Sequence, residues 1–122
     1  WLVDRALVLR EHDLELVGMA MRGIHALDPP QATRRILLNH YPALADELPS
    51  GMRFDLILAG HSHGGQVRLP FYGALVLPWG VGRYDLGYFE SKGGPLYVNA
   101  GIGTYRFPFR FNCRPEITVV TM

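Results

Sequence analysis

The apolar positions of this chain fall into short runs that are separated by segments rich in glycine, proline and charge. Residues 2–9 and 14–19 are apolar runs on either side of the polar residues 10–13. This pattern predicts two strands joined by a hairpin loop. Residues 36–38 and 54–59 are more continuously apolar, which is typical of buried strands. The first of them is expected to stop at Pro42.

Further strands are predicted in the second half of the chain. Residues 66–70 follow a glycine- and histidine-rich loop and have the pattern of a strand, as do residues 96–98 and 117–120. Three phenylalanines alternate with other residues and predict one face of a strand in the core. They are Phe107, Phe109 and Phe111.

Helical signals are few. A helical turn can start near Gln31, after two prolines, and residues 43–48 predict a short helix that ends at Pro49-Ser50-Gly51. No segment repeats at a fixed period and no linker is visible, so residues 1–122 are treated as one unit. The expected class is α/β, strand-rich, with a mixed sheet and few helices.

Composition narrows the class of protein. With 48% hydrophobic residues, the chain can bury a core as soluble globular proteins do. Its net charge of +1 does not suggest a nucleic-acid partner, whose basic binding face normally shows in the totals. Cys113 is the single cysteine, so a disulfide within the chain is excluded and a buried, apolar role is expected.

The ends and the hydropathy say little about location. No apolar run approaches the roughly 20 residues that span a bilayer. The chain opens on Trp1, within Trp-Leu-Val-Asp, and this looks like the interior of a longer protein. Any targeting segment is expected upstream.

Candidate chemistry centres on the string Gly60-His-Ser-His-Gly-Gly-Gln66. His61 and His63 are two residues apart, and a strand end points alternate side chains to one side, so both imidazoles can face one metal or two adjacent metals. The glycines allow a tight turn close to the ions. Two histidines at this spacing are by themselves weak evidence, and the flanking glycines and Gln66 favour a metal site. Ser62 also fits a Gly-x-Ser-x-Gly nucleophile pattern, but that loop needs a following helix, and residues 66–70 have the pattern of a strand.

Several stretches in order resemble the calcineurin-like metallophosphoesterase family. Gly60-His-Ser-His resembles its final metal motif, Gly-His-x-His. The longer string to Pro70, the aromatic-Gly segment Phe71-Tyr72-Gly73 and the strings at 97–104 and 108–117 resemble the bacterial membrane-associated or cell-envelope phosphodiesterase branch. The resemblance covers about residues 36–122 and spans most of the chain.

The resemblance implies an αββα sandwich, two mixed sheets with helices outside, of which this chain supplies the C-terminal half. It implies hydrolysis of a phosphomonoester or phosphodiester by metal-activated hydroxide attack on phosphorus, with two divalent metal ions (Mn, Fe or Zn) bridged by an aspartate. Carried over by position, His40 and His61 bind the second metal and His63 binds the first. A cytoplasmic-membrane or cell-envelope location is suggested by the resemblance alone.

The earlier motifs of the family are missing from the sequence. Asp-x-His, Gly-Asp-x-x-Asp and Gly-Asn-His do not occur, and Asp55 is expected to be structural. Two cations without a bridging anion repel each other, so at most one metal is expected for this chain alone. The alternative is a non-catalytic metal-binding fragment, or a half-domain that needs a partner chain. Without the first half an apolar sheet face is exposed, which predicts a dimer or a complementing N-terminal half.

Four arginines are candidates for contact with a phosphoester, although each is more often a solvated surface residue. They are Arg68, Arg83, Arg106 and Arg110.

Overall fold

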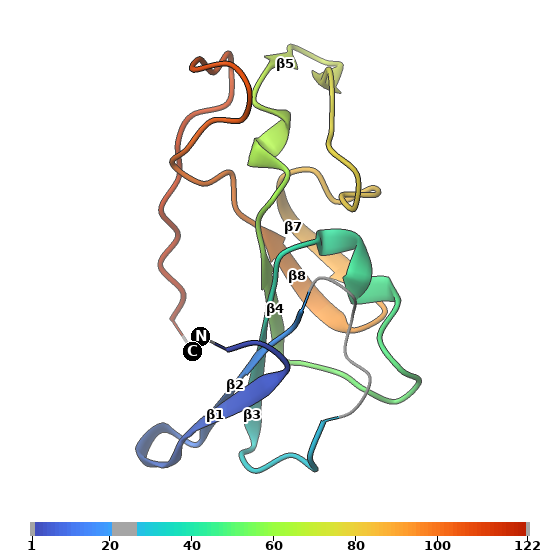
Figure 1. The fold of residues 1–122 in the computed structure, drawn as a ribbon, viewed down its shortest axis with the longest axis vertical. Helices are drawn as coiled ribbons and strands as arrows, with labels where there is room; N and C mark the ends of the chain where they lie inside the picture. Colours follow the sequence, from blue (N-terminus) through green and yellow to red (C-terminus); the bar gives the residue numbers. More distant parts are fainter. Residues whose placement is uncertain (1, 21–26, 122) are drawn as a thin grey trace.

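The computed structural model describes residues 2–20 and 27–121, and its main body is one mixed six-stranded sheet (Figure 1). The strand order is β1-β2-β3-β4-β8-β7. Strands β2, β3, β4 and β8 run parallel, and β1 and β7 are antiparallel edges. The strands are β1 (Arg5–Leu9), β2 (Leu14–Gly18), β3 (Arg34–Asn39), β4 (Leu56–Ala59), β7 (Gly87–Ser91) and β8 (Gly94–Val98). The predicted strand-rich α/β class with a mixed sheet is confirmed.

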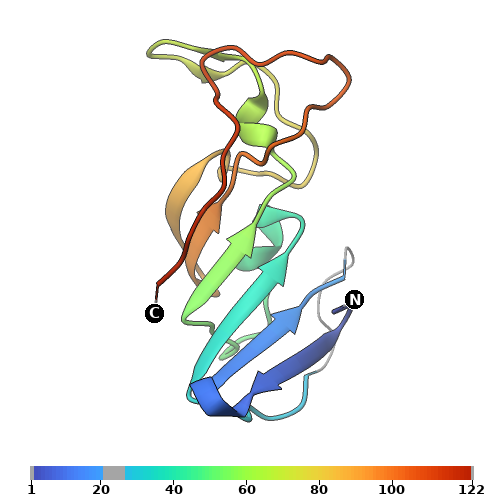
Figure 2. The ribbon, with the colours of Figure 1, turned by 90° about the vertical axis from the view of Figure 1, so that its left-hand side faces the viewer.

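A small hairpin stands beyond one end of the sheet. Its strands, β5 (Arg68–Leu69) and β6 (Gly73–Ala74), pair antiparallel. Figure 2 shows this hairpin next to the loop that begins after β8, with both above the ends of the parallel strands. Only two residues of the predicted strand 66–70 are therefore in a strand.

The N-terminal hairpin and the strands predicted at 36–38, 54–59 and 96–98 are confirmed. Between β1 and β2 the chain forms a short 3-10 turn, η1 (Arg10–His12), and then Asp13 takes a left-handed φ of 47° that reverses the direction. Strand β7 was missed by the sequence analysis. Its residues alternate in burial, but the run is short and begins at a glycine, so the signal was weak.

The helical predictions are partly wrong. Residues 43–48 contain a 3-10 helix, η2 (Pro42–Asp46), instead of an α-helix. No helical turn forms near Gln31, where residues 31–33 are irregular. The Thr33 amide instead donates a hydrogen bond to Asp13 Oδ1 at 2.9 Å, and this bond ties the segment to the end of the hairpin just before β3 begins.

Two predicted strands near the C-terminus are also wrong. Residues 117–120 are not in a strand, and Val119 is 87% exposed. The three alternating phenylalanines lie in an irregular loop and are each more than half exposed, so they are not part of the core. Phe111 forms one isolated bridge to Val67, and the Arg68 amide donates to the Phe111 carbonyl at 3.0 Å, but neither segment pairs further among residues 2–20 and 27–121. An apolar pattern alone therefore does not make a strand here.

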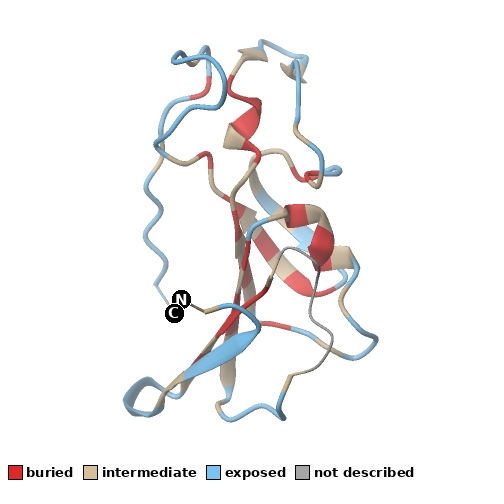
Figure 3. Cartoon of the chain, viewed as in Figure 1, coloured by how far each residue is buried: buried red, intermediate tan, exposed pale blue. Residues whose placement is uncertain are grey.

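The core lies on one face of the sheet. Val17, Leu37, Ile57 and Leu96 are register partners across the four parallel strands, and all are fully buried (Figure 3). Tyr84 and residues of η2 belong to the same buried cluster. The row therefore forms the contact between the sheet and the segments packed on this face.

The opposite face of the sheet is covered less completely. Leu38, Leu58 and Tyr97 are register partners on that face, and each is only half-buried. This face is therefore apolar and only partly covered within the described residues.

A hydrogen-bonded carboxylate joins three segments around the core. Asp46, the last residue of η2, accepts a hydrogen bond from the buried Tyr84 hydroxyl at 2.7 Å and another from the Lys92 amide at 2.9 Å. Partial burial acts to raise the pKa of Asp46, but these two hydrogen bonds, with the charges of Arg83 and Lys92, outweigh it and lower the pKa. The ionised carboxylate therefore stabilises the fold.

We expect Asp46→Asn to lower the free energy of unfolding at neutral pH by about 1–3 kcal/mol, because the amide cannot accept both hydrogen bonds as the carboxylate does. The folded pKa of Asp46 lies below its ordinary value of 3.8. The contribution is thus complete above the unfolded pKa and is lost as the pH falls through the folded pKa. Urea titrations at neutral and acidic pH should show the difference between the two proteins shrinking in acid.

The matched control is Glu47→Gln, the same change of acid to amide at the adjacent, exposed residue. It should leave the free energy of unfolding nearly unchanged at neutral pH. An equal loss for both variants would show that the Asp46 hydrogen bonds contribute nothing specific.

Candidate metal centre

Two histidines meet at the carboxyl ends of neighbouring parallel strands. His40 directly follows β3, and His61 lies two residues beyond β4. Because β3 and β4 are parallel and in register, their ends lie at one edge of the sheet. The ring centroids of His40 and His61 are 4.6 Å apart. The structure therefore brings together two of the three histidines that the sequence analysis selected.

Aromatic side chains pack around this pair. Tyr41 contacts both imidazoles edge-on, with ring centroids 4.9 Å from His40 and 4.5 Å from His61. Trp79 in turn packs on Tyr41 at 5.2 Å. The Trp79 carbonyl oxygen lies 2.9 Å from His61 Nε2. Sequence reasoning missed Tyr41 and Trp79, since neither falls in a motif and Trp79 comes from a distant loop.

The contact with the Trp79 carbonyl determines which nitrogen of His61 is free. A carbonyl only accepts, so the hydrogen bond requires the proton on Nε2. Nδ1 then keeps the lone pair that a metal needs. Backbone carbonyls commonly orient metal-ligating histidines in this manner. The donor chemistry of His61 therefore fits a metal ligand.

His40 is held toward its neutral form. Burial lowers its pKa from the ordinary value of 6.5, and the nearby charges of His61 and His63 lower it further. A histidine binds a metal only when it is neutral. The environment of His40 thus favours the ligand form at neutral pH.

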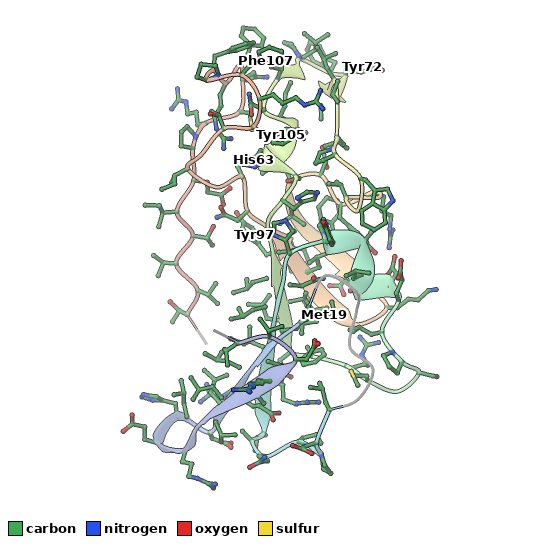
Figure 4. The ribbon with its side chains drawn as sticks, viewed as in Figure 1. Met19, His63, Tyr72, Tyr97, Tyr105 and Phe107 are labelled. Atoms are coloured by element: carbon green, nitrogen blue, oxygen red, sulfur yellow. The ribbon has the colours of Figure 1, made fainter. Side chains whose placement is uncertain are left out.

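His63 belongs to a separate part of the loop. It begins the 3-10 turn η3 (His63–Gly65), and its ring stacks on Tyr105 with centroids 6.4 Å apart (Figure 4). Its Nδ1 atom is buried and has no hydrogen-bond partner in the described part of the chain. An unpaired buried nitrogen costs free energy, and coordination to a metal would satisfy it.

The loop that carries these histidines has an unusual backbone. His61, His63 and Gln66 have positive φ values of 64°, 48° and 56°. Gly64 and Gly65 also have positive φ values, 59° and 74°. Left-handed conformations cost a residue other than glycine about 1 kcal/mol each and cluster at functional sites. The Ser62 hydroxyl is buried and accepts a hydrogen bond from the Gly64 amide at 3.0 Å. Only the three-residue η3 follows, so the helix that a serine nucleophile loop requires is missing.

Arg110, far from this loop in the sequence, stabilises it through hydrogen bonds to backbone carbonyls. Its guanidinium donates to the carbonyl oxygens of His63 at 3.2 Å and Ala100 at 2.8 Å. The Cys113 thiol also donates to the His63 carbonyl, at 3.3 Å, and is buried as predicted. The sequence analysis weighed Arg110 as a solvated residue or a phosphate contact. It is instead a half-buried structural residue that joins residues 60–66, called the metal loop here because they carry two of the candidate metal ligands, to the loop after β8.

The other arginine candidates differ in their surroundings. Arg68 donates to Asp85 Oδ2 at 2.8 Å and to the Gly64 carbonyl at 2.9 Å, so its charge is paired. Arg83 donates to the Tyr84 hydroxyl at 2.8 Å. Arg106 is exposed.

Carboxylates do not complete the site within residues 2–20 and 27–121. No group of three histidine, cysteine, aspartate or glutamate side chains is arranged there to hold a metal ion. Asp55 accepts a hydrogen bond from the Arg35 amide at 2.7 Å, which agrees with the expected structural role. A metal bound at these imidazoles would need further ligands besides the side chains that the described residues place there.

A mixed sheet that carries histidines at the ends of its parallel strands defines an α/β domain. Similar proteins identify the family. The uncharacterized metallophosphoesterase YkuE of Bacillus subtilis is 42% identical over 87 residues, which is 71% of this chain and 30% of its own length. The phosphodiesterase YaeI of Escherichia coli is 34% identical, over 88% of this chain and 41% of its own length. A transmembrane protein with metallophosphoesterase domain from Danio rerio is 35% identical, over 71% of this chain and 20% of its own length.

The chain belongs to the metallophosphoesterase family. It spans between a fifth and two fifths of the length of these three relatives. No family model matches the chain, and no solved structure matches it. In the part of the chain that the structure describes, no helix is both long and apolar enough to cross a membrane.

The left-handed loop should tolerate no side chain at Gly65. A Cβ atom there would lie 2.2 Å from the Ala74 Cβ, at a φ of 74°. We expect Gly65→Ala to lower the free energy of unfolding by about 2–4 kcal/mol, from roughly 1 kcal/mol of backbone strain and 1–3 kcal/mol of overpacking. Thermal and urea denaturation measure this loss.

Gly51→Ala is the matched control. Gly51 has a φ of 84°, but nothing lies within 4 Å of the added Cβ. This variant should show the backbone strain alone, about 1 kcal/mol. If both variants lost the same stability, the close packing of the metal loop on β6 would be refuted.

Proposed function

We propose that this chain is part of a metal-dependent phosphoester hydrolase and that His40, His61 and His63 are metal ligands. The observation that carries the proposal is the pair His40 and His61, whose rings lie 4.6 Å apart at the ends of two parallel strands in a member of the metallophosphoesterase family. A rigid sheet edge holds such ligands with little loss of entropy on binding. The substrate is proposed to be a phosphomonoester or a phosphodiester.

The three histidines have separate roles in this proposal. His40 and His61 share one metal, which their close contact supports. His63 binds the other metal through the buried Nδ1 atom that has no partner among the described residues. Mn, Fe and Zn all accept imidazole ligands, so each is compatible with this donor set.

The residues of the chain prepare the site for chemistry. When bound, a divalent metal ion polarises a phosphoryl oxygen and lowers the pKa of water. The Trp79 carbonyl fixes the orientation of the His61 ring, and partial desolvation lowers the pKa of His40. Arg110 and Cys113 hold the backbone of His63 in its left-handed conformation. Positioning of this kind is what the chain contributes.

The second candidate is a half-domain that depends on a partner. It is favoured by the shortage of metal-binding carboxylates among the described residues and by the half-covered leucines on the second sheet face. A segment that packs on this face and supplies aspartates would complete both the sandwich and the site. An N-terminal half would do both, whereas a second copy of this chain would cover only the face. Alone, the chain would then hold at most one metal.

A location at a membrane or in the cell envelope is also proposed. It is supported by the relative from Danio rerio, which is named as a transmembrane protein.

Loss of a ligand should weaken metal binding by this chain. We expect His61→Ala to reduce the affinity for Mn²⁺ or Zn²⁺ by roughly tenfold or more, since removal even of groups that only support a ligand costs 10–100-fold. Isothermal titration calorimetry of the purified chain measures this. The same substitution in a longer protein that carries the remaining motifs should abolish turnover of a nitrophenyl phosphodiester.

His12→Ala is the matched control, because His12 lies in the exposed turn η1 at the far end of the hairpin. Its affinity for the metal should equal that of the unmodified chain. Equal affinities for the His61→Ala and unmodified chains would refute the ligand role. Metal binding without turnover by the chain alone would favour the half-domain reading.

A further inference from the structure

An apolar cavity of about 600 Å³ opens beside the metal loop. This volume lies within the range of about 300–1,000 Å³ that is typical of small-molecule sites. Two segments form its walls, the one that contains the β5–β6 hairpin and the loop after β8. The apolar residues that line it include Leu75, Val76, Trp79, Tyr105, Phe107 and Phe109.

The floor of the cavity is the metal loop itself. Ser62, His63 and Gln66 all line it. In Figure 4, Tyr105 lies beside His63, and Phe107 lies above them, farther from the sheet. A molecule whose phosphate group sits at His63 could therefore extend directly into this cavity.

The aromatic wall, formed by Tyr105, Phe107 and Phe109, is hydrogen-bonded to the metal loop. Gln66 is almost fully buried and uses both ends of its amide, because Oε1 accepts from the Tyr105 amide at 2.6 Å and Nε2 donates to the Phe107 carbonyl at 2.7 Å. Arg110 ties the same loop to the His63 carbonyl. The cavity and the histidines thus form one preorganised unit.

A positively charged side chain, Arg106, is part of the cavity lining. Its guanidinium lies 5.6 Å from the centre of the Tyr105 ring. No carboxylate in residues 2–20 and 27–121 forms an ion pair with Arg106. An arginine that lines the same apolar cavity as His63 and has no carboxylate partner among the described residues complements a ligand that joins an anionic phosphate to an apolar group.

We propose that this cavity binds the alkyl group of an amphiphilic phosphoester, with the phosphate between Arg106 and the histidines. This inference rests on the proposed function and narrows its substrate class to phosphoesters that carry an alkyl chain. The walls offer apolar and aromatic surface and few polar groups. The binding free energy contributed by the ligand's alkyl group therefore comes from its burial and grows with its length.

Alkyl phosphates of increasing length test the proposal without any turnover. The protein is the Trp1→Phe variant, in which Trp79 at the cavity is the single remaining tryptophan. We expect butyl, hexyl and octyl phosphate, each below its micelle concentration, to bind saturably and to shift the Trp79 emission to shorter wavelength. Each added methylene should tighten binding by about two- to fourfold. Methyl phosphate should give no shift.

Two valine variants form a matched pair. Val76→Asp places a carboxylate in the cavity lining. It should weaken octyl phosphate binding by roughly tenfold or more, because the bound alkyl group would have to desolvate the carboxylate that Val76→Asp introduces. Val119→Asp makes the same change on the exposed segment outside the cavity and should have no effect. Both valines are largely exposed, so neither variant should unfold the protein. Arg106→Gln should weaken octyl phosphate but not octanol.

The absence of any length dependence, or equal effects of the two valine variants, would overturn the proposal. So would loss of octyl phosphate binding in a longer protein that contains the other family motifs, since the cavity would then be covered by protein. Saturable, length-dependent binding in both forms supports it. The proposed function is tested separately by metal titration, so a chain that binds octyl phosphate but no metal would refute the metal site and still support the alkyl cavity.

Discussion

The parallel pairing of β3 with β4 is the constraint on which the rest of this structure depends. The register places Leu37 opposite Ile57, and burial of this pair with its partners in β2 and β8 fixes how the strands align. A shift by one residue would turn these side chains to the opposite face, so the register is strongly specified. Because the strands are parallel, their carboxyl ends coincide, and His40 meets His61 as a consequence of core packing.

The metal loop needs further support, because its backbone is unfavourable on its own. Successive residues from His63 to Gln66 have positive φ values, and two of them are not glycine. The hydrogen bonds of Arg110, Cys113 and Gln66 offset this cost from segments about 40 to 50 residues away. The same bonds position the loop that carries the aromatic wall. One network therefore orders both the histidine that binds metal in the proposed site and the cavity beside it.

The two faces of the sheet have different consequences. One face is sealed by η2 and by the segment around Tyr84, so the fold has a core of its own. The other presents leucines that are only half-buried, and the described residues supply too few carboxylates for a complete site. In the proposed half-domain, one additional layer would account for both observations, since sandwich partners cover a sheet face and can deliver ligands to its edge. This agrees with the short span of the chain relative to its relatives.

The sequence by itself determined the family, the strand-rich class and the histidines worth testing, because these follow from local motifs and from short apolar runs. It also indicated the hairpin and the main parallel strands, whose signals lie within a few residues. It failed at residues 107–111 and 117–120, where an apolar pattern was present but backbone pairing among the described residues goes no further than the single bridge of Phe111 to Val67. Only the tertiary structure decided that Arg110 holds the His63 backbone by hydrogen bonds, that the Trp79 carbonyl orients His61 and that Phe107 and Phe109 line a cavity. Each of these depends on contacts between residues far apart in the chain, which no local pattern encodes.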